Sequence, residues 1–154
     1  MTESAALTLV PTSEVKTYRQ LFLDIHVEVR TEVGLMQDPF NAVDLFDERL
    51  TRYASRGGWE AIIGYNGEEP VGYVFGVPLG PGSVWWSSMR QLPPEDFTWE
   101  TGSRTFAVNE ILVRKRWRGT AGQAHPAYCT SRFSPSAWRN ARRFWSIPLA
   151  PTGD

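Results

Sequence analysis

The chain has 154 residues, of which 42% are hydrophobic, and a formal net charge of −1. This length and composition predict one globular domain that needs neither a disulfide nor a metal to fold. Its single cysteine, Cys129, excludes an intrachain disulfide, and no run approaches the roughly 18 apolar residues of a membrane span. We therefore expect a soluble cytoplasmic protein without a membrane partner and without a bound metal.

The small net charge averages two unlike parts of the chain. Residues 1–110 hold 8 basic and 16 acidic side chains, whereas residues 111–153 hold 8 basic side chains and no acidic one. The charge changes near residue 110, and the regular sequence pattern ends shortly afterwards, near residue 121. We predict a core domain over residues 1–121 and an irregular basic tail over residues 122–154.

The first part of the chain predicts a strand followed by two helices. The strand covers "AALTLV" (5–10), and the first helix begins near Glu14, with Ser13 as its N-cap, and ends at Gly34. The second helix is expected from Asp44 to Ser55, where the Gly57-Gly58 pair ends it. The apolar residues expected on the buried faces recur every three or four positions: Val15, Tyr18, Phe22, Ile25, Val29 and Val33 in the first helix, and Phe46, Leu50 and Tyr53 in the second.

The middle of the chain predicts further strands. Residues 59–65 and 70–79 are rich in β-branched and aromatic residues, and Asn66-Gly67 between them suits a tight antiparallel hairpin. Residues 80–104 form a long connection that contains Trp85 and Trp86. Connections of this length are uncommon unless they are functional, so the two tryptophans are expected either to roof an acceptor site or to form a lid over the core. A last strand is predicted over residues 105–113.

The order of these elements, with the segments "GWEAIIGYNGEEPVGYVFG" and "NEILVRKRWRGTA", resembles the GNAT superfamily of N-acetyltransferases over residues 6–120. The resemblance implies an α/β fold with a mostly antiparallel sheet and flanking helices. In that family the fourth strand hydrogen-bonds the pantetheine arm of acetyl-CoA. The loop after it, patterned Q/R-x-x-G-x-G/A, binds the pyrophosphate through backbone amides at the start of a helix. The implied activity is transfer of an acetyl group from acetyl-CoA to a primary amine of a small molecule or a peptide.

The pyrophosphate pattern fits this chain in two registers. Read literally, Arg116 to Ala121 match R-x-x-G-x-A; counted from the strand end, the motif begins at Arg118 and requires glycine at 121, where the chain has Ala121. We prefer the second register. By resemblance, the fourth strand supplies main-chain contacts and the loop supplies the pyrophosphate site, so the candidate cofactor-binding residues are Ile111, Leu112, Val113, Arg116, Arg118, Gly119, Thr120 and Ala121.

Glu110 and its neighbour Asn109 are the candidate catalytic residues. A carboxylate at this strand could deprotonate the amine as a general base, although a strand glutamate is more often solvated or paired in a salt bridge. Alternation along the strand predicts Glu110 on one face with Val108 and Leu112, beside any cleft. His26 lies near the apolar face of the first helix, and we expect it to have a packing or surface role.

The sequence after Thr120 does not continue the family pattern. Pro126 and Pro135 exclude a continuous helix over residues 121–137, so the fold is expected to be incomplete after the fourth strand, with that strand's edge exposed. A shift of reading frame between Thr120 and Tyr128 would explain this: read one frame over from Ala127, compatible codons give "LLHEPVLAERVAERATLLVD", an amphipathic helix and a strand. The 14 Arg against 2 Lys suit the GC-rich gene that this reading needs. An inactive truncated product is then an alternative.

A second alternative is a non-catalytic protein that binds nucleic acid through its basic and aromatic tail. Cations would contact phosphates, and aromatic rings would stack on bases. The acidic first 110 residues and the absence of a nucleic-acid-binding motif argue against this partner. The oligomeric state stays open, with a homodimer as one alternative. The residues concerned are Arg114, Lys115, Arg116, Arg118, Arg132, Arg139, Arg142 and Arg143, with Trp138, Phe144 and Trp145.

Overall fold

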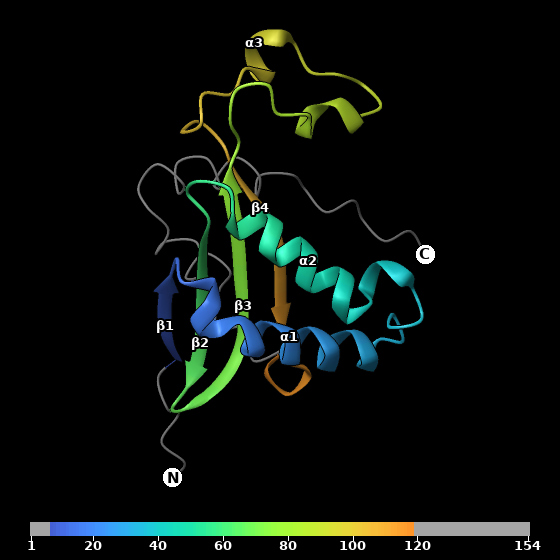
Figure 1. Ribbon diagram of the computed structural model, residues 1–154, viewed down its shortest axis with the longest axis vertical. Coiled ribbons are helices and arrows are strands. Elements are labelled where there is room, and N and C mark those ends of the chain that lie inside the picture. Colours follow the sequence, from blue (N-terminus) through green and yellow to red (C-terminus); the bar gives the residue numbers. More distant parts are fainter. Residues whose placement is uncertain (1–6, 119–154) are drawn as a thin grey trace, which may run out of the picture.

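A computed structural model describes residues 7–118, which fold into one antiparallel sheet with two helices on one of its faces (Figure 1). The four strands are neighbours in chain order, β1-β2-β3-β4, and every pair is antiparallel. The predicted α/β class and antiparallel sheet are thus confirmed. The expectations for residues 119–154 lie outside the described residues. The strands are β1 (Leu7–Thr12), β2 (Glu60–Asn66), β3 (Glu69–Pro78) and β4 (Phe106–Val113).

Helix α1 (Val15–Glu32) follows β1 directly. Its predicted cap at Ser13 is wrong: Glu14 occupies the N-cap position, and Thr12 Oγ1 accepts the Glu14 N–H at 2.9 Å. Gly34 has a φ of 70°, a left-handed value that glycine adopts easily, and it lies just beyond the helix end as expected. The predicted apolar face extends one step too far, because Val33 is 48% exposed.

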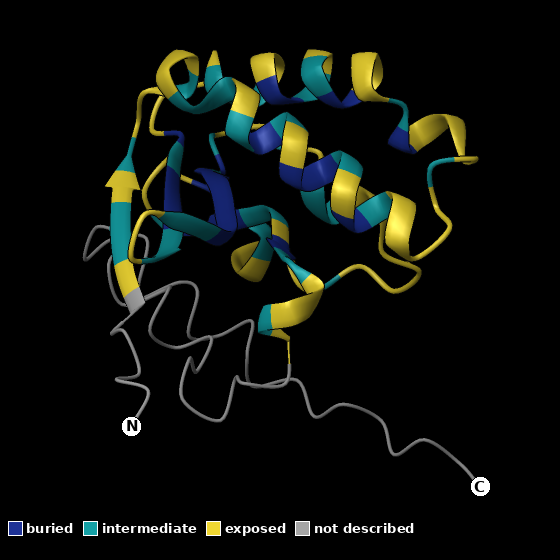
Figure 2. Ribbon diagram, turned by 90° about the horizontal axis from the view of Figure 1, so that it is seen from below, coloured by how far each residue is buried: buried dark blue, intermediate teal, exposed yellow. Residues whose placement is uncertain are grey.

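Helix α2 (Val43–Ala54) is reached through a short 3-10 helix, η1 (Pro39–Asn41). Phe46 and Leu50 are buried and Tyr53 is half-buried, so the predicted inner face is confirmed. Viewed from below, α1 and α2 turn buried residues toward the sheet and exposed residues outward (Figure 2). Such amphipathic helices gain most of their stability from this packing rather than from helix propensity.

The hairpin between β2 and β3 differs from the prediction by one residue. Asn66 pairs with Glu69 as the last pair of the ladder, so the two loop residues are Gly67 and Glu68. Gly67 has a positive φ of 62°. Within the described residues, every residue with a positive φ is a glycine. Glycine at the first loop position is sufficient for a tight hairpin, which is why Asn66 can remain in the strand.

The main core lies between the helices and the sheet. Phe22 of α1 is fully buried, and its ring meets Trp59, Tyr73 and Phe75 edge-on, with centroids 4.9 to 6.1 Å apart. Edge-to-face pairs of this kind add about 0.5–1.5 kcal/mol to the free energy gained by burying the rings. The opposite face of the sheet carries a smaller cluster of Ile62, Val74 and Phe106, with Val108 packed against it.

A bulge in β4 changes which side chains share a face. Phe75 pairs with Glu110 while Gly76 pairs with Val108, so Asn109 is an extra residue in β4. Leu112 belongs to the main core under the helices, whereas Val108 packs on the opposite face. The prediction that Glu110 shares one face of the strand with Val108 and Leu112 is therefore wrong for Val108. The extra residue reverses the alternation and turns Glu110 toward the helices, an effect typical of bulges beside functional sites.

The long connection between β3 and β4 lies beyond one end of the sheet (Figure 1). It contains a 3-10 helix, η2 (Trp85–Ser88), and a short helix, α3 (Glu95–Thr98). A last 3-10 helix, η3 (Lys115–Trp117), follows β4 at the opposite end of that strand. The fold thus separates the two segments that the sequence singled out, because β4 runs its whole length between them.

Candidate functional site

Glu110 and Arg30 form an ion pair between β4 and α1. Arg30 donates a hydrogen bond from Nη2 to Glu110 Oε1 at 2.6 Å, and the two side chains are 23% and 14% exposed. Within residues 7–118 we find no hydrogen bond to the other carboxylate oxygen, Oε2. The structure thus confirms the salt-bridge alternative for Glu110, and the role of a general base stays a prediction.

The surroundings of Glu110 favour its protonated form. Burial raises the pKa of the Glu110 carboxyl above its usual range, while the charges of Arg30 and, more weakly, Arg49 of α2 act in the opposite direction. Tyr73 of β3 lies close enough that its own pKa is raised well beyond the usual value, first by burial and second by the charge of Glu110. A carboxylate with a raised pKa is a better proton acceptor near neutral pH, as a general base requires.

The outer edge of β4 carries main-chain groups that point away from β3. The Arg114 N–H donates to the Val71 carbonyl oxygen at 2.9 Å, so Arg114 faces β3. Along an antiparallel strand, the main-chain N–H and C=O groups of successive residues point alternately to one neighbour and to the other side. The main-chain groups of Leu112 therefore also face β3, and the main-chain groups of Ile111 and Val113 face the outer edge. No strand of the described part of the chain pairs with that edge. Of the three residues predicted to offer main-chain contacts, Leu112 does not fit, and its side chain is buried in the core.

Arg118 folds back over the end of β4. Its Nε donates to the Val113 carbonyl oxygen at 2.7 Å, and its two terminal nitrogens reach the Glu32 carboxylate at 3.1 and 3.3 Å. Lys115 Nζ lies 3.8 Å from the same carboxylate. The candidate anion-binding cation therefore contacts an acidic side chain of α1, and a phosphate at this loop would have to replace Glu32.

The remaining basic residues after β4 also face glutamates. Arg114 Nε lies 2.9 Å from Glu28 Oε2, and Arg116 pairs with Glu69 at the start of β3. The four basic side chains of residues 114–118 are thus paired with three glutamates from α1 and β3. The structure gives no support here to a free basic surface for nucleic acid, because that binding depends on cations that can exchange counterions for phosphates.

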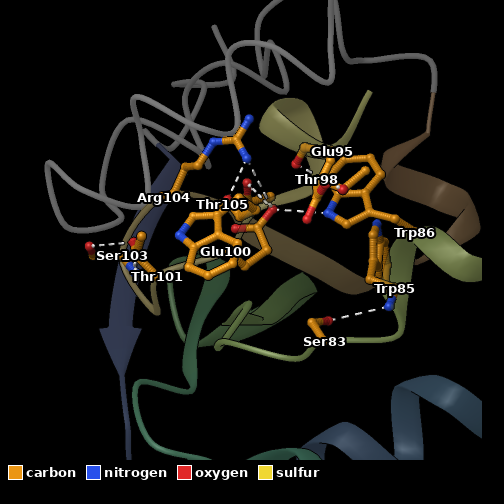
Figure 3. A network of polar contacts seen from close by, with 11 residues as sticks. Ser83, Trp85, Trp86, Glu95, Thr98, Glu100, Thr101, Ser103, Arg104 and Thr105 are labelled. Carbon is orange, nitrogen blue, oxygen red and sulfur yellow. Dashed lines mark hydrogen bonds and ion pairs between the residues drawn. The ribbon is translucent and has the colours of Figure 1, made fainter. Parts of the chain in front are cut away.

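Trp85 and Trp86 lie in the connection beyond the sheet, not over Glu110. The Trp86 Nε1–H donates to Glu100 Oε1 at 3.0 Å, Thr105 donates to the same oxygen at 2.9 Å, and Arg104 lies 4.0 Å away (Figure 3). The Trp86 ring also packs edge-on against Phe97 of α3. The buried Glu100 side chain thereby ties this segment together. Whether the two tryptophans roof an acceptor site or form a lid over the core stays a prediction.

His26 is buried between the two helices, so of the two roles expected from the sequence, packing or surface, it has the packing role. Its ring stacks on Phe46 with centroids 3.9 Å apart, and its Nε2 lies 2.9 Å from the Asn41 carbonyl oxygen, which requires the proton on Nε2. Burial lowers the pKa of His26, and the charges of Arg30 and Arg49 lower it further against the hydrogen bond to Asn41. His26 therefore binds a proton less readily in the folded protein than in the unfolded chain.

This burial predicts a loss of stability in acid. The unfolded chain protonates His26 near its ordinary pKa of 6.5, and the folded chain protonates it only at lower pH. The free energy of unfolding should thus be highest above pH 6.5 and fall as the pH falls toward the lowered folded value. His26→Phe keeps a ring against Phe46 and should flatten this part of the curve, measured by urea denaturation from pH 7.5 to 5. An equally steep curve in the variant would contradict the assignment.

The structure brings together some of the residues predicted for the site and separates others. Glu110, Ile111 and Val113 lie together on β4, and Arg118 contacts Val113, whereas Arg116 turns to Glu69. Asn109 is the bulge residue, and its Oδ1 is buried without a hydrogen-bond partner in the described chain. The sequence missed Arg30; its position next to Val29 on the buried face of α1 was the available indication. The predicted residues Gly119, Thr120 and Ala121 lie outside the described residues.

Two further searches cover only the described residues. Within residues 7–118, no three metal-binding side chains come together in a group that could hold an ion. No helix in that same part of the chain has the length and apolarity to cross a bilayer. Comparison of the chain with protein-family models and with curated proteins finds no match in either case.

Proposed function

We propose that the protein is an acetyl-CoA-dependent N-acetyltransferase that acts on a primary amine of a small molecule or a peptide. The observation that carries the proposal is the arrangement on β4. A half-buried carboxylate, Glu110, lies on the same strand as Ile111 and Val113, whose main-chain groups face an edge unpaired within the described sheet. The resemblance of the segments around this strand to the GNAT superfamily supplies the class of reaction.

The proposed reaction needs a proton acceptor and an electrophile. The amine nitrogen attacks the thioester carbonyl carbon of acetyl-CoA, a C–N bond forms, and the C–S bond breaks. Glu110 takes the proton that the amine loses, directly or through water, and the departing sulfur of CoA gains a proton to leave as the thiol. Outward N–H groups of β4 would bind the pantetheine amides and polarise the carbonyl, so the protein mainly orients two substrates.

Arg118 fits the role of a phosphate ligand. A guanidinium binds phosphate oxygens through two parallel hydrogen bonds, the same geometry in which Arg118 now meets the Glu32 carboxylate. A pyrophosphate carries more charge than a carboxylate and would compete with Glu32 for this side chain. The exchange would take place at the end of β4, next to the proposed pantetheine edge.

Binding of acetyl-CoA tests the proposal. We expect millimolar acetyl-CoA to raise the melting temperature of the full chain, because a ligand that binds only the folded state stabilises it by mass action. Gly119→Asp should abolish the shift, since it places a carboxylate where the motif positions the pyrophosphate. Thermal denaturation followed by circular dichroism measures both proteins.

The matched control is Gly57→Ala, an exposed glycine after α2 that has no described atom within 4 Å of an added Cβ. This variant should keep the full shift with acetyl-CoA. A folded wild-type protein that shows no shift, and releases no CoA thiol with a panel of amines, would refute the proposed activity.

A further inference from the structure

We propose that Arg30 is a positioning residue of the acetyl transfer: it holds the Glu110 carboxylate through one oxygen and leaves the other to accept the proton of the amine. The inference rests on the proposed function. It extends that function to a residue of α1 that neither the sequence motifs nor the family resemblance indicates.

The geometry of the pair carries the inference. Arg30 and Glu110 are 80 positions apart in sequence, and the contact joins α1 to the bulged part of β4. Only Oε1 of Glu110 meets the guanidinium, although arginine can bind both oxygens of a carboxylate. A one-oxygen contact fixes the carboxylate while it leaves Oε2 able to bind a proton or a water molecule.

The bulge makes this contact possible. Because Asn109 is an extra residue, Glu110 shares the helix-facing side of β4 with Leu112 instead of the face that holds Val108. In a regular ladder from the Gly76–Val108 pair onward, Asn109 would pair with Phe75, and Glu110 would lie on the side of the sheet away from α1. The bulge at Asn109 therefore places the Glu110 carboxylate on the helix-facing side, where it contacts Arg30.

The charged and titratable groups around Glu110 come from three elements. Arg30 of α1 contacts it directly, Arg49 of α2 acts at longer range, and the Tyr73 hydroxyl of β3 lies nearby without a hydrogen-bond partner in the described chain. Burial raises the pKa of Glu110, and Arg30 opposes this effect more strongly than Arg49 does. Arg30 thus keeps the carboxylate ionised, and able to accept a proton, at lower pH than burial alone would allow.

The experiment compares Arg30→Gln with a matched ion pair on the same helix. Arg19 of α1 contacts Asp47 of α2 at 2.5 Å, so Arg19→Gln also removes an ion pair of α1 but leaves Glu110 untouched. Two readouts are recorded from pH 4.5 to 9: the carbon-13 NMR titration of the Glu110 carboxyl in the glutamate-labelled full chain, assigned with Glu110→Gln, and the rate of CoA thiol release with an amine panel.

In Arg30→Gln we expect the Glu110 titration and the acid limb of the pH–rate profile to move to higher pH together. The Tm shift with acetyl-CoA should stay at the wild-type value. Arg30→Lys keeps the positive charge and should show a smaller movement in the same direction, which also covers the case in which Arg30→Gln does not fold. Arg19→Gln should move neither readout.

Unchanged Glu110 titration in both Arg30 variants would overturn the inference, and so would a movement of equal size in Arg19→Gln. A wild-type protein that transfers no acetyl group would instead contradict the proposed function. The NMR titration distinguishes the two failures, because it reports on the pair without requiring turnover.

Discussion

Replacing Glu110 with glutamine should lower kcat/KM for acetyl transfer by roughly 100-fold or more, the usual loss when a general base is removed. Glutamine has the same shape but cannot accept the proton of the amine. In the wild type, activity should fall as the pH drops through the raised pKa of Glu110, since the base is then protonated; this limb should disappear in the variant. CoA thiol release measured from pH 4.5 to 9 gives both results.

The control for this variant is Glu100→Gln. Glu100 is also a buried carboxylate next to an arginine, but it lies in the connection beyond the other end of β4. The Glu100→Gln variant should have the same pH–rate profile as the wild type. Equal losses of activity in Glu100→Gln and Glu110→Gln, or full activity in Glu110→Gln, would show that Glu110 is not the proton acceptor.

Gly76→Ala is expected to destabilise the protein by about 3 kcal/mol or more, a large cost for one methyl group. Gly76 lies in β3 opposite the bulged part of β4, and an added Cβ would lie 2.6 Å from Phe106 Cε1 and closer still to the Ala107 carbonyl oxygen. The backbone oxygen cannot move aside without breaking the β3–β4 ladder. Urea denaturation followed by tryptophan fluorescence measures the loss.

Gly57→Ala is the matched control for this change, because it adds the same methyl group at an exposed position with no described atom within 4 Å. It should alter the free energy of unfolding by no more than about 0.5 kcal/mol. A Gly76→Ala protein as stable as Gly57→Ala would mean that β3 and β4 do not approach each other this closely in solution.

The helices and strands were predictable because each has a local pattern. The three- and four-residue spacing around Phe22 and Phe46 identifies both helices, and the β-rich runs identify the strands to within two residues of their ends. The errors fall where a single hydrogen bond or dihedral angle decides the outcome, as at Ser13 and Asn66. Turn and cap positions of this kind depend on the final geometry and not on composition.

The candidate site was less predictable, because its main contact joins distant segments. Glu110 could be selected as a carboxylate on a strand, but its partner Arg30 belongs to a helix 80 positions earlier. The bulge at Asn109 leaves no trace in the sequence "FAVNEILV", which reads as a regular strand. The basic run 114–118 looked free in the sequence, and only the fold brings Glu28, Glu32 and Glu69 against it.

The acidic residues of α1 near its end give this helix a fixed orientation about its own axis. Glu28 and Glu32 are one turn apart, so they lie on the same side of the helix and both reach cations after β4, while Arg30 between them points to another side and reaches Glu110. Rolling the helix in either direction would separate opposite charges on two sides at once. Apolar packing alone tolerates such rolling, since hydrophobic contacts have no direction. An anion that displaces Glu32 from Arg118 would therefore weaken the restraint on one side of α1. The restraint on the other side, the Arg30–Glu110 pair, would remain.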